Sequence, residues 1–245
     1  MRMRVIPVLL LHKGGLYKTV KFSKPTYVGD PINAVRIFND KEVDELVILD
    51  IDAGKAKRPP NYNQISDIVS EAFMPIAYGG GISNVDEAAK LYYNGVEKIV
   101  LNTAILSNQQ LINNIAERFG NQSIIASIDY KKKIFGSNKI HSHSKNRVPN
   151  ISIESFAKRC EDAGAGEIML NCVDKDGTYN GYDCEIIKSV SSTVTVPVIA
   201  CGGAGNKTDF TKAIQHGASA VAAGSMFVFQ RPNQAVLIQY TNSYR

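Results

Sequence analysis

Short apolar runs alternate along the chain with longer segments in which apolar residues recur at every third or fourth position. The short runs are typical of strands buried on both faces of a parallel sheet, and the longer segments are typical of amphipathic helices. The predicted strands are 5–11, 45–51, 75–78, a run ending at Thr103, 123–130, 167–173, 197–200 and a run ending at Ser225.

The predicted helices have recognisable starts. Asp30 is expected to cap a helix that begins at Pro31, because proline suits the first helical position. Further helices are predicted from Asn84, from Asn206 and over 61–73, 108–119 and 153–163. A short hairpin is expected over 17–22, and 235–240 is expected to form a last helix or a tail.

One unit occurs twice in the sequence. Residues 75–103 and 197–225 align without a gap at an offset of 122 positions, which is 197 − 75. In each copy a short apolar run ends in paired glycines, a helix follows, and a second apolar run ends in a hydroxyl residue. The matched positions are Gly80 with Gly202, Gly81 with Gly203, Asn84 with Asn206, Gly95 with Gly217 and Thr103 with Ser225. This order predicts a right-handed βαβ unit with parallel strands.

The duplication extends beyond this unit. Leu46 falls on Ile168 and Asp52 falls on Asp174 at the same offset. Four βα units in each half predict a (β/α)₈ TIM barrel that forms one domain over 1–245. Its half-barrels are expected at about 1–120 and 121–245. A doubly wound open sheet is the alternative, although it does not require matched halves.

The glycine pairs suggest chemistry at the strand ends. A glycine pair directly after a parallel strand lets backbone N–H groups converge on an anion without interference from Cβ. The hydroxyl of Thr103 or Ser225 adds a donor in each copy. Two such cradles on one rim predict a small-molecule substrate with a phosphate at each end. Glycines that only permit tight turns are the alternative, and their recurrence favours phosphate binding.

Composition narrows the class of protein. With 245 residues and 44% hydrophobic content, the chain can bury a barrel core. We expect a cytoplasmic protein, because no apolar run spans a membrane and no signal peptide is recognised. The four cysteines lack metal-ligand spacing, so no metal and no cofactor are expected. The net charge of +5 suits an anionic small molecule better than a nucleic acid. The basic cluster 131–133 is either a solvated loop or a collector of phosphorylated substrate.

Carboxylates at the strand ends are the candidates for proton transfer. Asp129 ends an apolar run, and partial desolvation there is expected to raise its pKa into a range useful for acid or base catalysis. The alternative is a polar strand end that binds the loop backbone. Asp50, Asp174 and Asp176 are further candidates, and the last two more often form a turn.

Two basic features remain open. Lys18 either covers a phosphate by closing its hairpin over the mouth or is an ordinary surface charge. His141 and His143 lack a local third ligand, so they are expected to face solvent rather than to bind a metal.

Several motifs are distributed along the sequence, and they are GDP at 29–31, YGGGI at 78–82, SIDY at 127–130, DKDG at 174–177 and PVIACGGAG at 197–205. Together they resemble the cyclase subunit of imidazole glycerol phosphate synthase over nearly the whole chain. The resemblance implies a (β/α)₈ barrel that receives ammonia from a glutaminase subunit on its N-terminal face. The ammonia would pass through the barrel to a bis-phosphorylated ribulosyl substrate at the rim, giving imidazole glycerol phosphate and an aminoimidazole carboxamide ribonucleotide.

The resemblance also implies roles for individual residues. Asp129 matches one of two catalytic aspartates. One phosphate site is matched by Gly81, Asn102 and Thr103, with Gly80 beside them, and the other by Asp176, Gly177, Gly202, Gly203, Gly224 and Ser225. The charged ring that gates the ammonia entrance is matched by Arg4, Glu45, Lys98 and Glu167, and the glutaminase interface by Gln122.

The sequence departs from the family pattern at the rim. Leu10 occupies the position of the second catalytic aspartate, and the internal alignment pairs it with Asp129. Asn171 and Cys201 stand where the family has a threonine and a serine. This pattern resembles a paralogous branch associated with sugar amidation in surface-glycan synthesis.

Three functions follow from this departure. The preferred prediction is an ammonia conduit with Val8, Leu10 and Leu11 as apolar lining, which supplies a sugar amidotransferase and has lost ordinary cyclase activity. The alternatives are a working cyclase of histidine biosynthesis and a scaffold that only activates the glutaminase. No membrane partner is expected.

Overall fold

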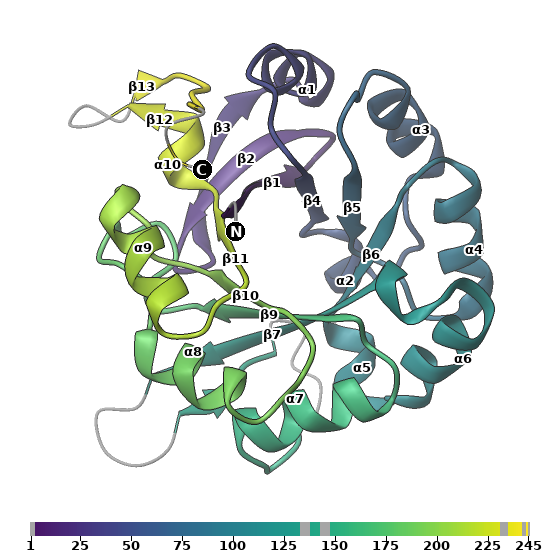
Figure 1. Cartoon of the computed structure of the whole chain (residues 1–245). Coiled ribbons are helices and arrows are strands. Elements are labelled where there is room, and N and C mark those ends of the chain that lie inside the picture. The colour runs from purple at the N-terminus through teal and green to yellow at the C-terminus, as the bar shows by residue number, and fades with distance from the viewer. Residues whose placement is uncertain (1–2, 133–137, 143–147, 231–234, 242–243, 245) are drawn as a thin grey trace.

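The chain forms a closed barrel of parallel strands surrounded by helices (Figure 1). The computed structural model describes residues 3–132, 138–142, 148–230, 235–241 and 244. Within that part of the chain, eight parallel strands follow one another around the barrel in sequence order. They are β1 (Arg4–His12), β4 (Leu46–Asp50), β5 (Ile76–Gly79), β6 (Lys98–Leu101), β7 (Ile124–Lys131), β9 (Glu167–Cys172), β10 (Val198–Cys201) and β11 (Ala220–Ala223).

The pairing of the last strand with the first decides between the two predicted architectures. β11 runs parallel to β1, with Val221 beside Val5 and Ala222 beside Ile6. The predicted (β/α)₈ barrel is therefore confirmed, and the open-sheet alternative is wrong.

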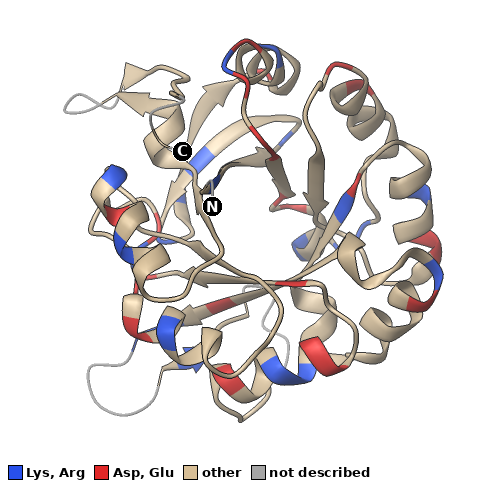
Figure 2. Ribbon diagram, viewed as in Figure 1, with Lys and Arg blue, Asp and Glu red and all other residues tan. Residues whose placement is uncertain are grey.

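Helices form the outer layer around the strands (Figure 1). The longer ones are α1 (Pro31–Asp40), α3 (Tyr62–Ser70), α4 (Val85–Tyr93), α6 (Gln110–Phe119), α7 (Ile153–Asp162), α8 (Cys184–Ser191) and α9 (Lys207–Gln215). Short helical turns are α2 (Ala53–Ala56), α5 (Thr103–Ser107), η1 (Asn121–Ser123) and α10 (Ser225–Val228). Charged residues of both signs are spread over this outer layer (Figure 2).

The predicted helix starts follow from side-chain capping. Asp30 accepts a hydrogen bond from the backbone N–H of Asn33 at 2.9 Å, and Pro31 follows it. The matched residues Asn84 and Asn206 each cap a helix in the same way. The helix α8 was not predicted from the sequence, and its N-cap Asp183 makes no side-chain capping bond.

Two apolar layers hold the barrel together. Alternate strand residues point outward into a large core between the sheet and the helices, and the others fill the barrel interior. The interior residues are Ile6, Val8, Val47, Ala77, Val100, Ile125, Met169, Ile199, Ala220 and Ala222, with Leu10, Leu49 and Cys201 packed against them. Leu11 belongs to the outer core, so its predicted place in the lining is wrong. The reason is the two-residue period of a strand, which puts Leu10 and Leu11 on opposite faces.

Smaller strands extend the predicted framework. The predicted hairpin is longer than expected and consists of β2 (Gly15–Val20) and β3 (Ser23–Gly29), with β2 antiparallel to β1. β8 (Lys139–Ile140) pairs with β7, and β12 (Phe229–Gln230) pairs with β13 (Ala235–Val236). The segment 235–240 contains no helix, so of the two predicted forms the tail is correct. No helix in the described ranges is long and apolar enough to cross a membrane.

Candidate active site

A cavity of about 460 Å³ opens at the carboxyl ends of the barrel strands. Of the residues predicted for the rim, all but Asp174 line this one cavity, although they come from distant parts of the chain. They are Lys18, Asp50, Gly80, Gly81, Asn102, Thr103, Asp129, Asn171, Asp176, Gly177, Cys201, Gly202, Gly203, Gly224 and Ser225. A cavity of this size accommodates a ligand of several hundred daltons.

The glycine turns of the two copies have the same backbone character. Gly80 and Gly81 have φ of 121° and 76°, and Gly202 and Gly203 have φ of 84° and 118°. A Cβ on Gly81 would also lie 2.6 Å from the carbonyl oxygen of Arg58. These positions therefore require glycine both for backbone conformation and for close approach.

Replacing Gly81 by alanine tests the close approach separately from the backbone conformation. Gly14 is the matched control, because its φ is 81° but nothing lies within 4 Å of an added Cβ. We expect Gly14→Ala to lower the free energy of unfolding by about 1 kcal/mol, and Gly81→Ala by about 2–4 kcal/mol. Urea unfolding of both variants measures the difference, and equal losses would show that the contact with Arg58 carries no cost.

Asp129 lies at the carboxyl end of β7 and contributes to the floor of the cavity. Burial raises the pKa of Asp129 to about 7, and the like charge of Asp176 acts in the same direction. Hydrogen bonds with the side chains of Asn171 and Asn102 oppose this rise in pKa. A carboxyl group with a pKa near neutrality exchanges a proton readily at physiological pH, as general acid or base catalysis requires.

Leu10 and Val8 of β1 line the cavity wall, and Leu10 packs against the apolar barrel interior. Among the described residues, the acidic side chains that line the cavity are Asp50, Glu87, Asp129 and Asp176. Of these, Asp50, Glu87 and Asp176 each accept hydrogen bonds from other groups of the protein, so they are not available as a second proton-transfer group.

The three engaged carboxylates have well-defined partners. Asp50 accepts from Arg58 at 2.8 Å and from two backbone N–H groups at 2.9 and 3.0 Å. Asp176 accepts from Lys18 at 2.8 and 3.0 Å, and Glu87 accepts from the backbone and side chain of Ser83. Asp174, which does not line the cavity, accepts from the backbone N–H of Lys132 at 2.7 Å and so organises a loop.

Lys18 is only 6% exposed, so the alternative that it is an ordinary surface charge is wrong. Its ammonium group donates to Asp176 and to the carbonyl oxygen of Thr19 at 2.9 Å. The β2–β3 hairpin carries it over the mouth, where the backbone N–H of Lys21 also donates to the carbonyl oxygen of Asp176. The hairpin is thereby attached to the loop that follows β9.

The mouth is also lined by three basic residues that were not predicted from the sequence, and these are Lys55, Lys57 and Arg58. They lie close together in a short basic segment after β4, which was the available signal. The basic cluster predicted as a possible collector of substrate was 131–133. Lys131 is exposed, Lys132 pairs with Asp183 at 3.1 Å, and residue 133 lies outside the described residues. Neither described residue of that cluster lines the cavity.

The opposite end of the barrel carries a ring of paired charges. Arg4 donates to Glu45 at 2.7 Å and to Glu167 at 2.9 Å. Lys98 lies 3.2 Å from Glu167 and 3.6 Å from Glu45. Each of these residues lies at or next to the amino end of a barrel strand, so the four predicted gate residues do meet in space. Pairing offsets the desolvation that single charges would suffer there.

The remaining candidates lie away from the cavity. Gln122 is exposed in η1, where its side-chain amide donates to the carbonyl oxygen of Phe119 at 3.4 Å. His141 is half-buried with its ring centroid 6.4 Å from that of Phe22, so it faces solvent in part, and His143 lies outside the described residues. The described part of the chain contains no cluster of three His, Cys, Asp or Glu residues suited to a metal ion.

The family profile described as "Histidine biosynthesis protein" matches residues 4–232, so the chain belongs to this family. Within the family, the chain is similar to HisF-type subunits of imidazole glycerol phosphate synthase. A protein of Pseudomonas aeruginosa, provisionally named imidazole glycerol phosphate synthase subunit hisF2, is 50% identical over 98% of this chain and 96% of its own length.

Two further relatives show the range of the similarity. A Leptospira interrogans protein with the provisional name HisF is 44% identical over 98% of this chain and 95% of its own length. The Streptomyces griseus imidazole glycerol phosphate synthase subunit HisF is 40% identical over 92% of this chain and 90% of its own length.

Proposed function

We propose that this chain is the barrel subunit of a glutamine amidotransferase complex, in which it conducts ammonia from a glutaminase to an acceptor and does not perform cyclisation at the rate of a histidine-pathway enzyme. The observation that carries the proposal is Leu10, which lines the mouth where the resemblance requires a second aspartate beside Asp129. The relatives are named as subunits of imidazole glycerol phosphate synthase, which supports a role as one subunit of a larger enzyme.

The loss of one carboxylate has a direct chemical consequence. Leucine neither accepts nor donates a proton, so an acid and base pair is reduced to Asp129 alone. Loss of one member of such a pair slows proton-dependent chemistry by about 10²–10⁴-fold. Asp50 and Asp176 do not replace it, because both are held by cations.

The barrel interior suits the transport of a neutral molecule. Its wall is apolar over the ten buried residues of the interior layer, so an ammonium ion would lose its hydration without compensation. Neutral ammonia carries no such cost. The ring of Arg4, Glu45, Lys98 and Glu167 closes the amino-terminal end, and we propose that a HisH-like glutaminase docks there, with Gln122 at its edge.

We propose that the acceptor is a sugar bound to a separate amidotransferase of surface-glycan synthesis. The mouth residues Leu10, Asn171 and Cys201 support this assignment, because they differ from the aspartate, threonine and serine that the resemblance implies for cyclisation. The two glycine cradles would still bind phosphate groups of a small molecule.

A working cyclase of histidine biosynthesis is the second candidate. The observations that favour it are Asp129, whose pKa of about 7 fits acid and base chemistry, and the positive φ of both glycines in each matched turn. An activator of the glutaminase that conducts no ammonia is the third candidate, and it makes different predictions for the charged ring.

Turnover of the bis-phosphorylated ribulosyl substrate with ammonium chloride tests the proposal. We expect a rate about 10²–10⁴-fold below that of the Streptomyces griseus HisF subunit under the same conditions, since one carboxylate is missing. We also expect the chain to stimulate the glutaminase encoded in the same genome. A rate equal to that of the Streptomyces subunit would instead establish the histidine-pathway cyclase.

Lys98→Met tests the conduit. Removing the ammonium group leaves Glu45 and Glu167 with Arg4 as their shared partner, so the ring no longer closes in the same arrangement. In the complex of barrel, glutaminase and amidotransferase, we expect glutamate formation to exceed formation of the aminated product by several-fold. Lys158→Met, on the exposed surface of α7, is the control and should keep the two rates equal. An activator without a conduit predicts no uncoupling.

A further inference from the structure

The connection from β4 to α3 carries a basic segment along one side of the mouth. Lys55, Lys57 and Arg58 all line the cavity that contains the two glycine cradles. The segment follows the strand end at Asp50 directly and includes the short helix α2. Its position raises the question of which cradle it serves.

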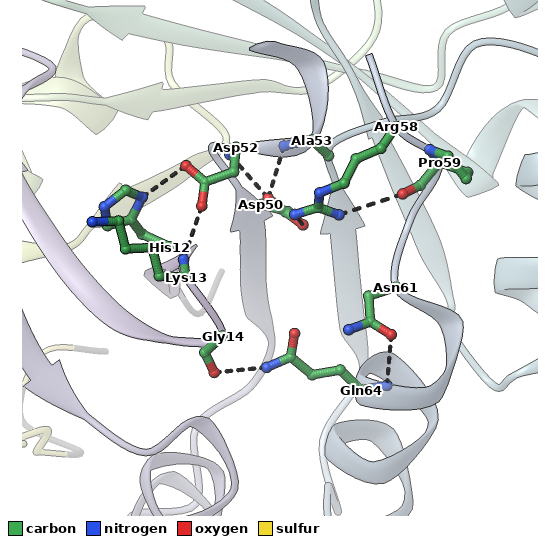
Figure 3. Close-up of polar contacts among 10 residues, drawn as sticks. All are labelled: His12, Lys13, Gly14, Asp50, Asp52, Ala53, Arg58, Pro59, Asn61 and Gln64. Carbon is green, nitrogen blue, oxygen red and sulfur yellow. Dashed lines mark hydrogen bonds and ion pairs between the residues drawn. The ribbon is translucent and has the colours of Figure 1, made fainter. Parts of the chain in front are cut away.

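Arg58 is held in place by a buried carboxylate. The side chain of Asp50 is 4% exposed, and one of its oxygens accepts from the Arg58 guanidinium at 2.8 Å. The other oxygen accepts from the backbone N–H groups of Asp52 and Ala53 (Figure 3). A second guanidinium nitrogen donates weakly to the carbonyl oxygen of Pro59 at 3.4 Å. The guanidinium has five N–H donors, and its side chain is 40% exposed, so donors remain for a ligand in the cavity.

This segment packs against the first glycine cradle. A Cβ on Gly81 would lie 2.6 Å from the carbonyl oxygen of Arg58, and one on Gly80 would lie 2.4 Å from that of Asp50. The backbone of Arg58 is therefore in direct contact with the turn that forms the first cradle. The second cradle differs, because the ammonium group of Lys18 is buried and donates to Asp176 and to the carbonyl oxygen of Thr19, whereas the side chain of Arg58 is 40% exposed.

We propose that Arg58, anchored by Asp50, is the ligand-binding cation of the first cradle and selects a phosphate monoester there. A guanidinium presents a rigid fork of donors that matches phosphate oxygens, and a phosphate monoester carries close to two negative charges at pH 7. Lys55 and Lys57 add positive potential on the same side. Asp50 is then a positioning residue for Arg58. The inference rests on the proposed two-phosphate mouth and adds the group that distinguishes its two ends.

Calorimetric titration tests the assignment with three ligands: the bis-phosphorylated ribulosyl substrate and its two monophosphate products, imidazole glycerol phosphate and the aminoimidazole carboxamide ribonucleotide. We expect Arg58→Gln to weaken binding of the bis-phosphate about 10- to 100-fold, since hydrogen bonds to a charged group are lost. It should weaken only one of the two monophosphates, and Arg58→Lys should fall between Arg58→Gln and the natural protein. Arg36→Gln is the control, because Arg36 makes a two-point contact with Glu71 on the outer surface.

Arg58→Gln also leaves Asp50 without its cation, so a second variant separates binding from stability. In the double variant Asp50→Asn with Arg58→Gln, both charges are gone and the amide pair retains hydrogen bonding. The same selective loss of one monophosphate is expected. Equal weakening of both monophosphates, or binding equal to that of Arg36→Gln, would overturn the assignment of Arg58.

The titrations also separate this inference from the proposed function. If the natural protein bound none of the three ligands at millimolar concentration, the first cradle would not be a phosphate site and the assignment of Arg58 would fail. The conduit would be unaffected by that result, because its test follows glutamine and aminated product. Conversely, coupling of the two rates in Lys98→Met would leave the phosphate titrations unchanged.

Discussion

Leu10→Asp is expected to raise the rate of imidazole glycerol phosphate formation from the ribulosyl substrate and ammonium by about 10²-fold or more. The substitution restores a carboxylate at the carboxyl end of β1, at the wall of the cavity that also contains Asp129. One member of such a pair donates a proton while the other accepts one, and the two charges keep their pKa values apart. The gain should appear in kcat, because phosphate binding is unchanged.

The neighbouring strand provides a matched control for this experiment. Leu49 lies beside Leu10 in the parallel pairing of β1 with β4, and it also lines the cavity. Leu49→Asp introduces the same charge into the same mouth at a different place, so no gain is expected. If Leu10→Asp also brought no gain, a single missing carboxylate would not account for the lost activity, and Asn171 and Cys201 would be the next positions to restore.

Asp129→Asn is expected to increase the free energy of unfolding by about 2–4 kcal/mol at pH 8 and to have little effect at pH 4. Burial raises the pKa of Asp129 to about 7, whereas the pKa of an ordinary aspartate is 3.8. The folded state therefore holds a proton more tightly than the unfolded chain does. Its contribution to stability is present in full below pH 3.8 and is lost as the pH rises to about 7. Asparagine is neutral at every pH, so it removes this loss.

Urea unfolding at several pH values between 4 and 8 measures the effect. The control is Asp86→Asn, because the side chain of Asp86 on α4 is 90% exposed and does not line the cavity. We expect its effect to stay within about 0.5 kcal/mol over the same range. A pH-independent difference between Asp129→Asn and the natural protein would contradict a raised pKa at this position.

These two experiments address the same conflict between function and stability. A carboxylate in an apolar mouth is costly to the fold, yet its shifted pKa suits proton transfer. With leucine at position 10, Asp129 has no carboxylate partner from β1, and the costly group is still present. A buried carboxylate with a purely structural role is expected to form an ion pair, as Asp50 does with Arg58 and Asp176 does with Lys18.

The periodic pattern of the sequence was sufficient for the barrel. Each strand appears as a short apolar run and each βα turn carries local signals such as the caps Asp30, Asn84 and Asn206. The duplication added the number of strands, and the glycine pairs marked two turns with left-handed backbone. These features are local or repeat at a fixed offset, and so they can be read without coordinates.

Side-chain partners at the mouth depended on contacts between distant segments. Lys18 has no sequence neighbour that explains its burial, since its partner Asp176 lies 158 residues away. Arg58 and Asp50 lie only eight residues apart, but their pairing needs the turn of α2 and the packing of its connection on Gly81. The basic cluster at 131–133 is more conspicuous in sequence, and its described residues lie outside the cavity.

The sequence by itself predicted the strands of the barrel, the two matched glycine turns and a leucine, Leu10, near the end of the first strand, because these depend on residue type and spacing along one segment. Only the tertiary structure decided which charges at the mouth are engaged and which remain for a ligand, because that depends on which strand ends and loops meet when the barrel closes. It thereby assigned Asp50 to Arg58 and Asp176 to Lys18, and it left Asp129 as the mouth carboxylate whose proton is held near neutral pH.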